Sequence, residues 1–164
     1  MKTEQLQIRV SPQEKEAIRK KAKLANLDMS EWILAQLLPA QSNTFQMLIR
    51  NLSACVNEKD RYYAFAEIND FLCGLDSGDL SQAVGDIEGS SLRDFERNYL
   101  AAMVELACHR RKVEPPDWVF AATGLPQPHF GSSMLSLRLH LLANSPAPFR
   151  KRNIYIDSSV GDRV

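Results

Sequence analysis

The sequence predicts a mainly α-helical protein with two parts, a short N-terminal module at 1–40 and an α-helical domain with a short terminal strand at 41–164. Three observations support this division. Polar and apolar residues alternate over 5–10, as in a strand with one buried face. Two amphipathic helices with start signals follow before Pro39. Beyond a polar segment at 41–44, which we interpret as a linker, apolar residues recur at helical spacings of three and four.

The predicted strand has two faces of different chemistry. Its apolar face carries Leu6, Ile8 and Val10. Its polar face carries Gln5, Gln7 and Arg9. Glutamine and arginine side chains can hydrogen-bond two atoms of one base edge in the major groove of DNA. Because so short a strand is unstable alone and its bare edge needs a partner, we expect a homodimer in which two such strands pair.

Both helices of the N-terminal module carry recognisable ends. Ser11 is placed to cap a helix that continues to about Ala25, and Pro12 suits its first position. Asp28 is placed to cap a second helix, which Pro39 ends. The first helix is rich in cations: Lys15, Arg19, Lys20, Lys21 and Lys23. That basic face is either a solvated surface or a track for DNA phosphates.

This order of elements within residues 2–39 resembles the ribbon-helix-helix family of bacterial DNA-binding proteins, of the Arc and MetJ type. The resemblance is carried by the segments 5–10, 11–14 and 27–33. It implies an intertwined dimer whose two strands form an antiparallel ribbon in the major groove of double-stranded operator DNA. It also implies the site residues, with base reading by Gln5, Gln7 and Arg9 and phosphate binding by the amides of Met29 and Ser30.

Composition limits the possible classes of protein. The 164 residues include 20 basic and 20 acidic side chains, and residues 1–39 carry a net charge of +2 against −2 for the remainder. This mild asymmetry predicts modest non-specific DNA affinity. We expect a cytoplasmic protein without a membrane span or secretory signal, because no long apolar run occurs and the N-terminus is polar. The widely spaced Cys55, Cys73 and Cys108 suit reduced thiols.

The longer part of the chain predicts several helices and a short final strand. Helices are expected from near Ser42, from Asn57, near Leu80–Ile87, and from Ser90 or Ser91 to a basic cluster at 109–112. The segment 135–142 alternates like a strand but also has helical spacing, and we favour a helix because the apolar stretch is long. A β-type run follows at 154–156.

The C-terminal region also resembles a known class. The segments 115–118, 125–126 and 145–154 resemble the C-terminal domain of bacterial antitoxin-like proteins, which are often encoded beside a nucleotidyltransferase-like toxin. The resemblance implies a domain that binds a cognate toxin. We place the partner contacts at four tail residues: Phe149, Arg150, Arg152 and Asn153. The alternative is that 146–154 is simply a tail docked on its own domain.

No constellation of catalytic residues is apparent. None of His109, His129 and His140 has a metal-ligand spacing to a cysteine, and no nucleotide-binding or hydrolase motif occurs. We therefore expect no enzyme, no metal and no cofactor. The predicted function is that of a type II antitoxin, a DNA-binding dimer that represses its own operon and neutralises a toxin. Alternatives are a stand-alone repressor whose second domain senses a ligand or sets the oligomeric state, and a scaffold that the ribbon merely dimerises.

Overall fold

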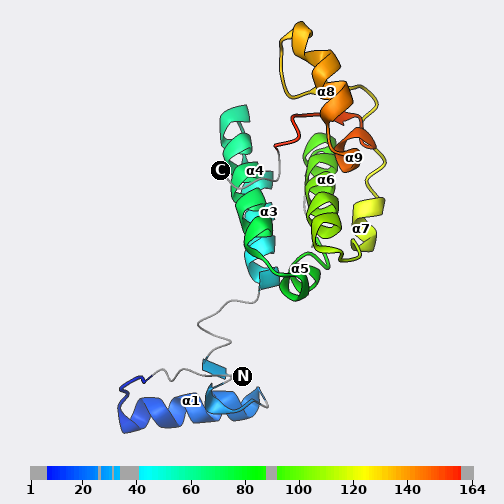
Figure 1. Ribbon diagram of the computed structural model, residues 1–164. Helices are drawn as coiled ribbons and strands as arrows, with labels where there is room; N and C mark the ends of the chain where they lie inside the picture. Colours follow the sequence, from blue (N-terminus) through cyan, green and yellow to red (C-terminus); the bar gives the residue numbers. More distant parts are fainter. Residues whose placement is uncertain (1–6, 26, 31, 34–40, 88–91, 160–164) are drawn as a thin grey trace. The chain divides into compact units, whose positions relative to one another are not determined.

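The chain folds into two compact units, residues 1–40 and 41–164, which are described separately. The structure is a computed structural model (Figure 1) that describes residues 7–25, 27–30, 32–33, 41–87 and 92–159. Within these residues no helix has the length and apolarity needed to cross a membrane.

The first unit is built around helix α1, Pro12–Leu24. Its start is the predicted one, because the Ser11 hydroxyl accepts a hydrogen bond from the Glu14 amide (3.3 Å) and the Glu14 carboxylate accepts one from the Ser11 amide (2.7 Å). A second helical segment follows Asp28, whose carbonyl accepts a hydrogen bond from the Trp32 amide (2.9 Å). Pro39, the expected end of this segment, lies outside the described residues.

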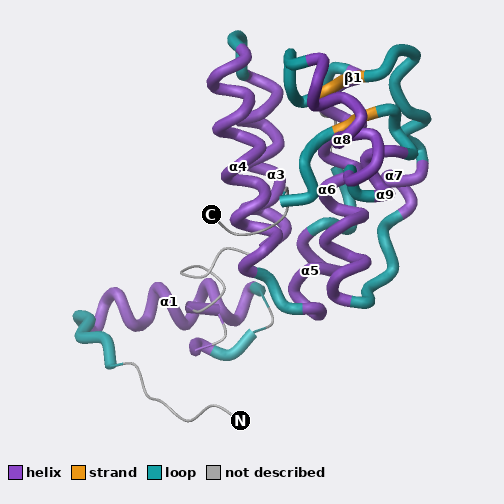
Figure 2. The backbone as a smooth tube through the Cα atoms, turned by 45° about the horizontal axis from the view of Figure 1, so that its top comes forward, coloured by secondary structure: helices purple, strands orange, loops and turns teal. Residues whose placement is uncertain are grey.

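The second unit consists of helices packed around one another, with a very small sheet at one end (Figure 2). In chain order its elements are α3 Gln41–Ala54, α4 Glu58–Gly74, α5 Ser77–Ala83, α6 Asp94–Arg111, α7 Asp117–Phe120, β1 His129–Phe130, a 3₁₀ turn η1 Leu135–Leu137, α8 Arg138–Asn144, α9 Ala147–Arg150 and β2 Ile154–Tyr155. Helices α3 and α4 pack side by side, and α6 contacts α4, α5, α7 and α9.

Helix α6 is the centre of the second unit because the middle of its sequence is apolar on nearly every side. Residues 100–105 are all buried, including the charged Glu105. A helix that is apolar all round must be covered all round, and the neighbouring helices supply the cover. Phe45 and Ile49 of α3 and Phe149 of α9 are completely buried in the same core.

Two predicted helix starts and one linker need correction. The polar residues 41–44 are the first turn of α3 and not a linker. The short acidic helix begins at Ser77 rather than Leu80, because the Asp76 carboxylate accepts a hydrogen bond from the Asp79 amide (2.8 Å). Helix α6 starts after Arg93, whose amide donates to the Glu96 carboxylate (3.0 Å), and not after Ser90 or Ser91.

The C-terminal tail closes the fold through a parallel pairing of β1 with β2. The predicted β-type run is thus confirmed, but its partner strand was not predicted from the sequence. The Gly131 amide donates to the Tyr155 carbonyl (2.8 Å), and the buried Ser145 hydroxyl accepts a hydrogen bond from the Ile156 amide (2.8 Å). The segment 135–142 forms η1 and most of α8, so the choice of helix over strand is confirmed.

Candidate nucleic-acid interface

The predicted base readers lie on the segment that leads into α1. Gln7 and Arg9 are exposed, and Gln5 lies outside the described residues. Between and after them, Ile8 and Val10 are 53% and 43% exposed, although both are apolar. In the single chain, residues 7–10 have no regular secondary structure. Because the strand prediction concerns a pair of chains, it stays a prediction.

The described residues of the first unit bury very little apolar surface. Among its described residues only Ala22 is buried, while Leu24 is 88% exposed and Leu27 is also exposed. Trp32 and Ile33 are half-buried. These apolar side chains are therefore available to pack against a second copy of the unit.

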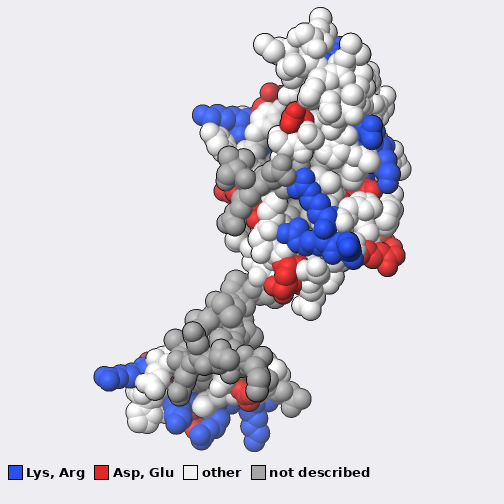
Figure 3. All heavy atoms as spheres, viewed as in Figure 1, with Lys and Arg blue, Asp and Glu red and all other residues white. Residues whose placement is uncertain are grey.

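The predicted phosphate site lies beside the basic face of α1. Met29 and Ser30 are the first residues of the second helical segment, where amides have no partners within the helix. A shallow depression at this point is lined by Arg19, Ala22, Lys23, Leu27 and Met29. The Lys21 ammonium lies 5.9 Å from the centre of the Trp32 ring, which links α1 to the second segment. Figure 3 shows the Lys and Arg side chains of both units.

Two of the four predicted partner residues are buried and serve the fold instead, which corrects their interpretation as a contact surface. Phe149 is fully buried, and its ring packs edge-on against Tyr99 with 5.2 Å between centroids. Arg152 is 4% exposed, and its guanidinium donates to the Glu105 carboxylate at 2.6 Å. It also donates to the carbonyls of Pro148 (2.8 Å) and Val119 (2.7 Å). A buried arginine needs such partners, so the docked-tail alternative describes Phe149 and Arg152.

The other two predicted partner residues differ from each other. Arg150 is exposed. Asn153 is half-buried, has a positive φ of 61° and donates through its side-chain amide to the Leu125 carbonyl (3.1 Å). Asparagine tolerates this backbone conformation better than most residues. Asn153 thus shapes the turn that leads into β2, and Arg150 alone of the four is both exposed and on a helix.

Sequence reasoning missed Glu105, the acidic centre of the tail's docking site. Its carboxylate receives hydrogen bonds from Arg152 and from Lys151 (2.9 Å), and His109 lies 3.6 Å away. Burial alone raises the pKa of Glu105, but the hydrogen bonds from Lys151 and Arg152 outweigh it and lower the pKa below 4.5. A lone acidic residue within the apolar run 100–107 was the available signal, since a buried charge requires a partner.

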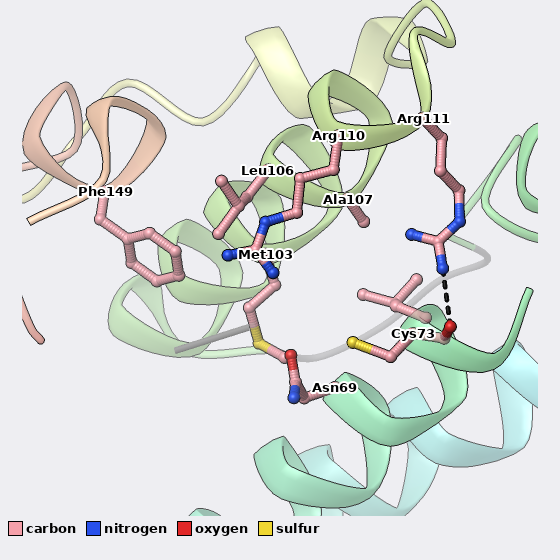
Figure 4. Close-up of a pocket in the computed structure, with 9 residues that line it drawn as sticks. Asn69, Cys73, Met103, Leu106, Ala107, Arg110, Arg111 and Phe149 are labelled. Atoms are coloured by element: carbon pink, nitrogen blue, oxygen red, sulfur yellow. Dashed lines mark hydrogen bonds between the residues drawn. The ribbon is translucent and has the colours of Figure 1, made fainter. Parts of the chain in front are cut away.

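Two clefts of the second unit differ in their capacity for a ligand. The cleft between α4 and α6 beside Phe149 (Figure 4) has a cavity volume of about 20 Å³, room for about one water molecule. A polar cleft between α3 and α5 has about 430 Å³, within the range of small-molecule sites. Its lining includes Ser42, Asn43, Gln46, Arg50 and Asp86. Among the described residues, no three His, Cys, Asp or Glu side chains gather as metal ligands would.

The first unit is similar to a known family. A family model described as NikA-like, mobilization protein NikA, matches residues 1–45. This match supports an N-terminal ribbon-helix-helix DNA-binding domain. No curated protein and no solved structure matches the chain. The resemblance of the C-terminal region to antitoxin-like proteins receives no support from these comparisons.

Proposed function

We propose that this protein is a dimeric, sequence-specific binder of double-stranded DNA, and not an enzyme. The family match over residues 1–45 carries the proposal. Two features of the first unit support it. Its apolar side chains Ile8, Val10 and Leu24 are exposed in the single chain, as expected for a unit completed by a second copy. Its polar residues Gln7 and Arg9 are exposed as well.

In the proposed complex, the paired strands lie in the major groove and the second helices contact the backbone. Gln5, Gln7 and Arg9 of both chains face the bases, which gives six reading side chains for one dimer. The amides of Met29 and Ser30 bind a phosphate, with Arg19 and Lys23 close by. Because these contacts displace counterions from DNA, the affinity falls steeply as salt concentration rises.

The biological setting of DNA binding has three candidates. The antitoxin hypothesis assigns operator binding and autorepression to the first unit and neutralisation of a cognate toxin to the second. It rests on the resemblance of the segments 115–118, 125–126 and 145–154 to antitoxin-like proteins. The description of the matched family as a mobilization protein favours a second setting, in which the bound DNA is a transfer origin. A stand-alone repressor with a ligand-binding second unit would use the polar cleft between α3 and α5.

Arg9→Ala tests the DNA-binding proposal most directly. We expect a loss of about 1–3 kcal/mol for each base contact removed, together with a relaxed sequence preference, measured by gel shift on the DNA upstream of the gene. The matched control is Arg97→Ala, which removes an exposed arginine of α6 in the second unit. Binding of Arg9→Ala at wild-type affinity and selectivity would show that the ribbon does not read bases.

The candidate biological settings differ in the partner protein and in the DNA that the protein is expected to bind. Co-expression with the product of the neighbouring gene, followed by a salt titration of the purified complex on the shared promoter, tests the antitoxin hypothesis. A tight complex that binds the promoter supports it. Promoter binding without a partner favours the stand-alone repressor. Preference for a transfer-origin fragment over the promoter favours the mobilization setting.

A further inference from the structure

The second unit exposes a dense group of apolar side chains on η1 and α8. The group consists of Met134, Leu135, Leu137, Leu139 and Leu142, and we call it the apolar ridge. Each of these side chains is between 39% and 79% exposed. Single exposed leucines are common on protein surfaces, but five large apolar residues within nine positions mark an interaction site. The ridge lies at the end of the unit away from α5 (Figure 1).

The ridge lies on a segment whose two ends are held in place by hydrogen bonds. Leu141 on the same helix is buried, and the Ser145 amide donates to its carbonyl (2.9 Å). The Ser145 hydroxyl in turn bonds to β2, and Gly131 before the ridge bonds to Tyr155. Both ends of the segment are therefore fixed to the tail, and the ridge forms a preorganised surface.

The charges around the ridge favour a second copy of this chain as its occupant. The segment 131–146 contains no carboxylate. Its one arginine, Arg138, lies over the Phe130 ring at 4.8 Å, and His140 lies 3.5 Å from Asp157. Each charged or titratable side chain of the segment thus has a partner in its own chain. Two ridges can approach each other because Asp157, an acidic side chain beside the segment, lies against His140 of its own chain and is not left unpartnered.

The size of the ridge indicates when such a contact forms. The exposed parts of its five side chains correspond to roughly three whole leucines, or about 450 Å² of apolar surface per chain. Two fully covered ridges would bury about 900 Å², which is just under the roughly 1,000 Å² that a stand-alone interface needs. A contact of this size forms when the two chains are already joined elsewhere, since joining raises their effective concentration to the millimolar range.

We propose that the two apolar ridges of one dimer pack against each other, so that the dimer has a second contact besides the ribbon. The proposal depends on the proposed function only for the dimer that joins the chains. It assigns the second unit a role in setting the geometry of the dimer. The contact is apolar, so it persists at high salt concentrations that release DNA.

Cysteine cross-linking of the full chain tests this contact. Ser136→Cys places a thiol in the exposed turn between Leu135 and Leu137 without removing a ridge residue. With a short bismaleimide, we expect covalent dimer in several-fold excess over two controls. One control is the unaltered chain, which accounts for Cys55, Cys73 and Cys108. The other is Thr123→Cys, at an exposed position outside the ridge.

A charged substitution in the ridge completes the test. Adding Leu135→Glu and Leu139→Glu to the Ser136→Cys chain is expected to reduce the cross-link to the control level, while circular dichroism stays unchanged because both positions are exposed. A cross-link that survives these changes would overturn the proposal, because it would arise from random collision. If the circular dichroism spectrum changes, the test is repeated with Leu139→Ser as the only substitution added to the Ser136→Cys chain. The cross-link is again expected to fall to the control level.

Sedimentation of the same samples separates this proposal from the proposed function. A dimer by mass without excess cross-link at Ser136→Cys overturns the ridge contact and leaves the DNA-binding dimer intact. A tetramer that Leu139→Glu reduces to a dimer also overturns it, because the ridges would then join separate dimers. A monomer at micromolar concentration contradicts the dimer itself, and with it both proposals.

Discussion

The two units of this chain contrast in where their apolar surface lies. The second unit surrounds α6 with its own helices and buries Phe45, Phe149 and seven of the leucines between them. The first unit buries one described residue, Ala22, and exposes Leu24 and Leu27. The difference teaches that the second unit has its own core within one chain, whereas the first, in the proposed dimer, completes its core with a second copy.

The units contrast equally in how they use their cations. In the second unit Arg152 pairs with a buried carboxylate, and Arg111 donates to the carbonyls of Leu75 (2.6 Å) and Cys73 (2.7 Å) at the end of α4. In the first unit the lysines of α1 are exposed. Basic residues therefore play two roles in this chain. In the second unit they stabilise the fold, and on α1 they form an exposed surface.

The substitution with the largest expected effect removes the aromatic side chain that anchors the tail. Phe149→Ala should destabilise the second unit by about 3–5 kcal/mol, because a completely buried phenylalanine leaves a cavity. Urea unfolding followed by circular dichroism measures the loss. Phe120→Ala, which truncates a phenylalanine that is 61% exposed, is the control and should change little. Equal effects of the two changes would contradict the docked position of Phe149.

The next effect concerns the buried carboxylate. Glu105→Gln leaves Arg152 buried without a negative partner, and we expect a loss of about 3–5 kcal/mol in the free energy of unfolding. Lys151→Ala, which removes the exposed partner of the same carboxylate, should cost under about 1 kcal/mol. If Lys151→Ala costs as much as Glu105→Gln, the main partner of Glu105 is Lys151.

The same carboxylate gives a pH dependence with a definite sign. The pKa of Glu105 is lowered on folding, so its contribution to stability is complete above the usual value of 4.5 and disappears as pH falls through the lowered value. Unfolding of the wild type should therefore become easier as pH decreases below about 4.5, more so than unfolding of Glu105→Gln. Urea titrations at several acid pH values compare the two slopes.

Much of the helical framework was predictable from local signals, because caps and apolar spacing act over a few residues. Asn57 caps α4 as predicted, with its side chain accepting a hydrogen bond from the Asp60 amide (2.8 Å). The start of α6 was not predictable in the same way. Serines at 90 and 91 are better caps by residue type, yet the chain uses Arg93, whose guanidinium also reaches the Cys55 carbonyl (3.2 Å). That contact spans 38 residues and leaves no local signal.

The candidate sites were predictable to different degrees for the same reason. The base readers and the phosphate-binding amides come from a pattern within forty residues, and they stay a prediction. The role of Arg152 depends on Glu105, 47 positions earlier, and the pairing of His129 with Ile154 spans 25 positions. A sequence read alone places Phe149 and Arg152 in a polar, proline-rich tail that looks exposed. Only the packed structure shows that this tail fills the side of α6.

Unfolding at different chain concentrations sharpens the contrast between the units. The two tryptophans report on one unit each, Trp32 on the first and Trp118 on the second. In a Trp118→Phe chain, the Trp32 transition should rise by about 1.4 kcal/mol for each tenfold increase in concentration, because unfolding separates the dimer. In a Trp32→Phe chain, the Trp118 transition should move less, since that unit has its own core. Equal shifts would show that the units unfold together.

The smallest expected effect concerns the start of α1, where the reading segment meets the helix. Ser11→Ala removes the hydroxyl that accepts from the Glu14 amide and should cost about 1 kcal/mol per chain in the Trp32 transition. The other half of the capping box survives, because the amide of residue 11 still donates to the Glu14 carboxylate. That backbone hydrogen bond is the main reason that the pKa of Glu14 is lowered. Ser11→Ala should therefore keep most of the acid sensitivity of this transition, whereas Glu14→Gln should abolish it. If Ser11→Ala also abolishes it, the hydroxyl and not the backbone amide is what positions the carboxylate, and the geometry that places Arg9 three residues before α1 depends on one side chain.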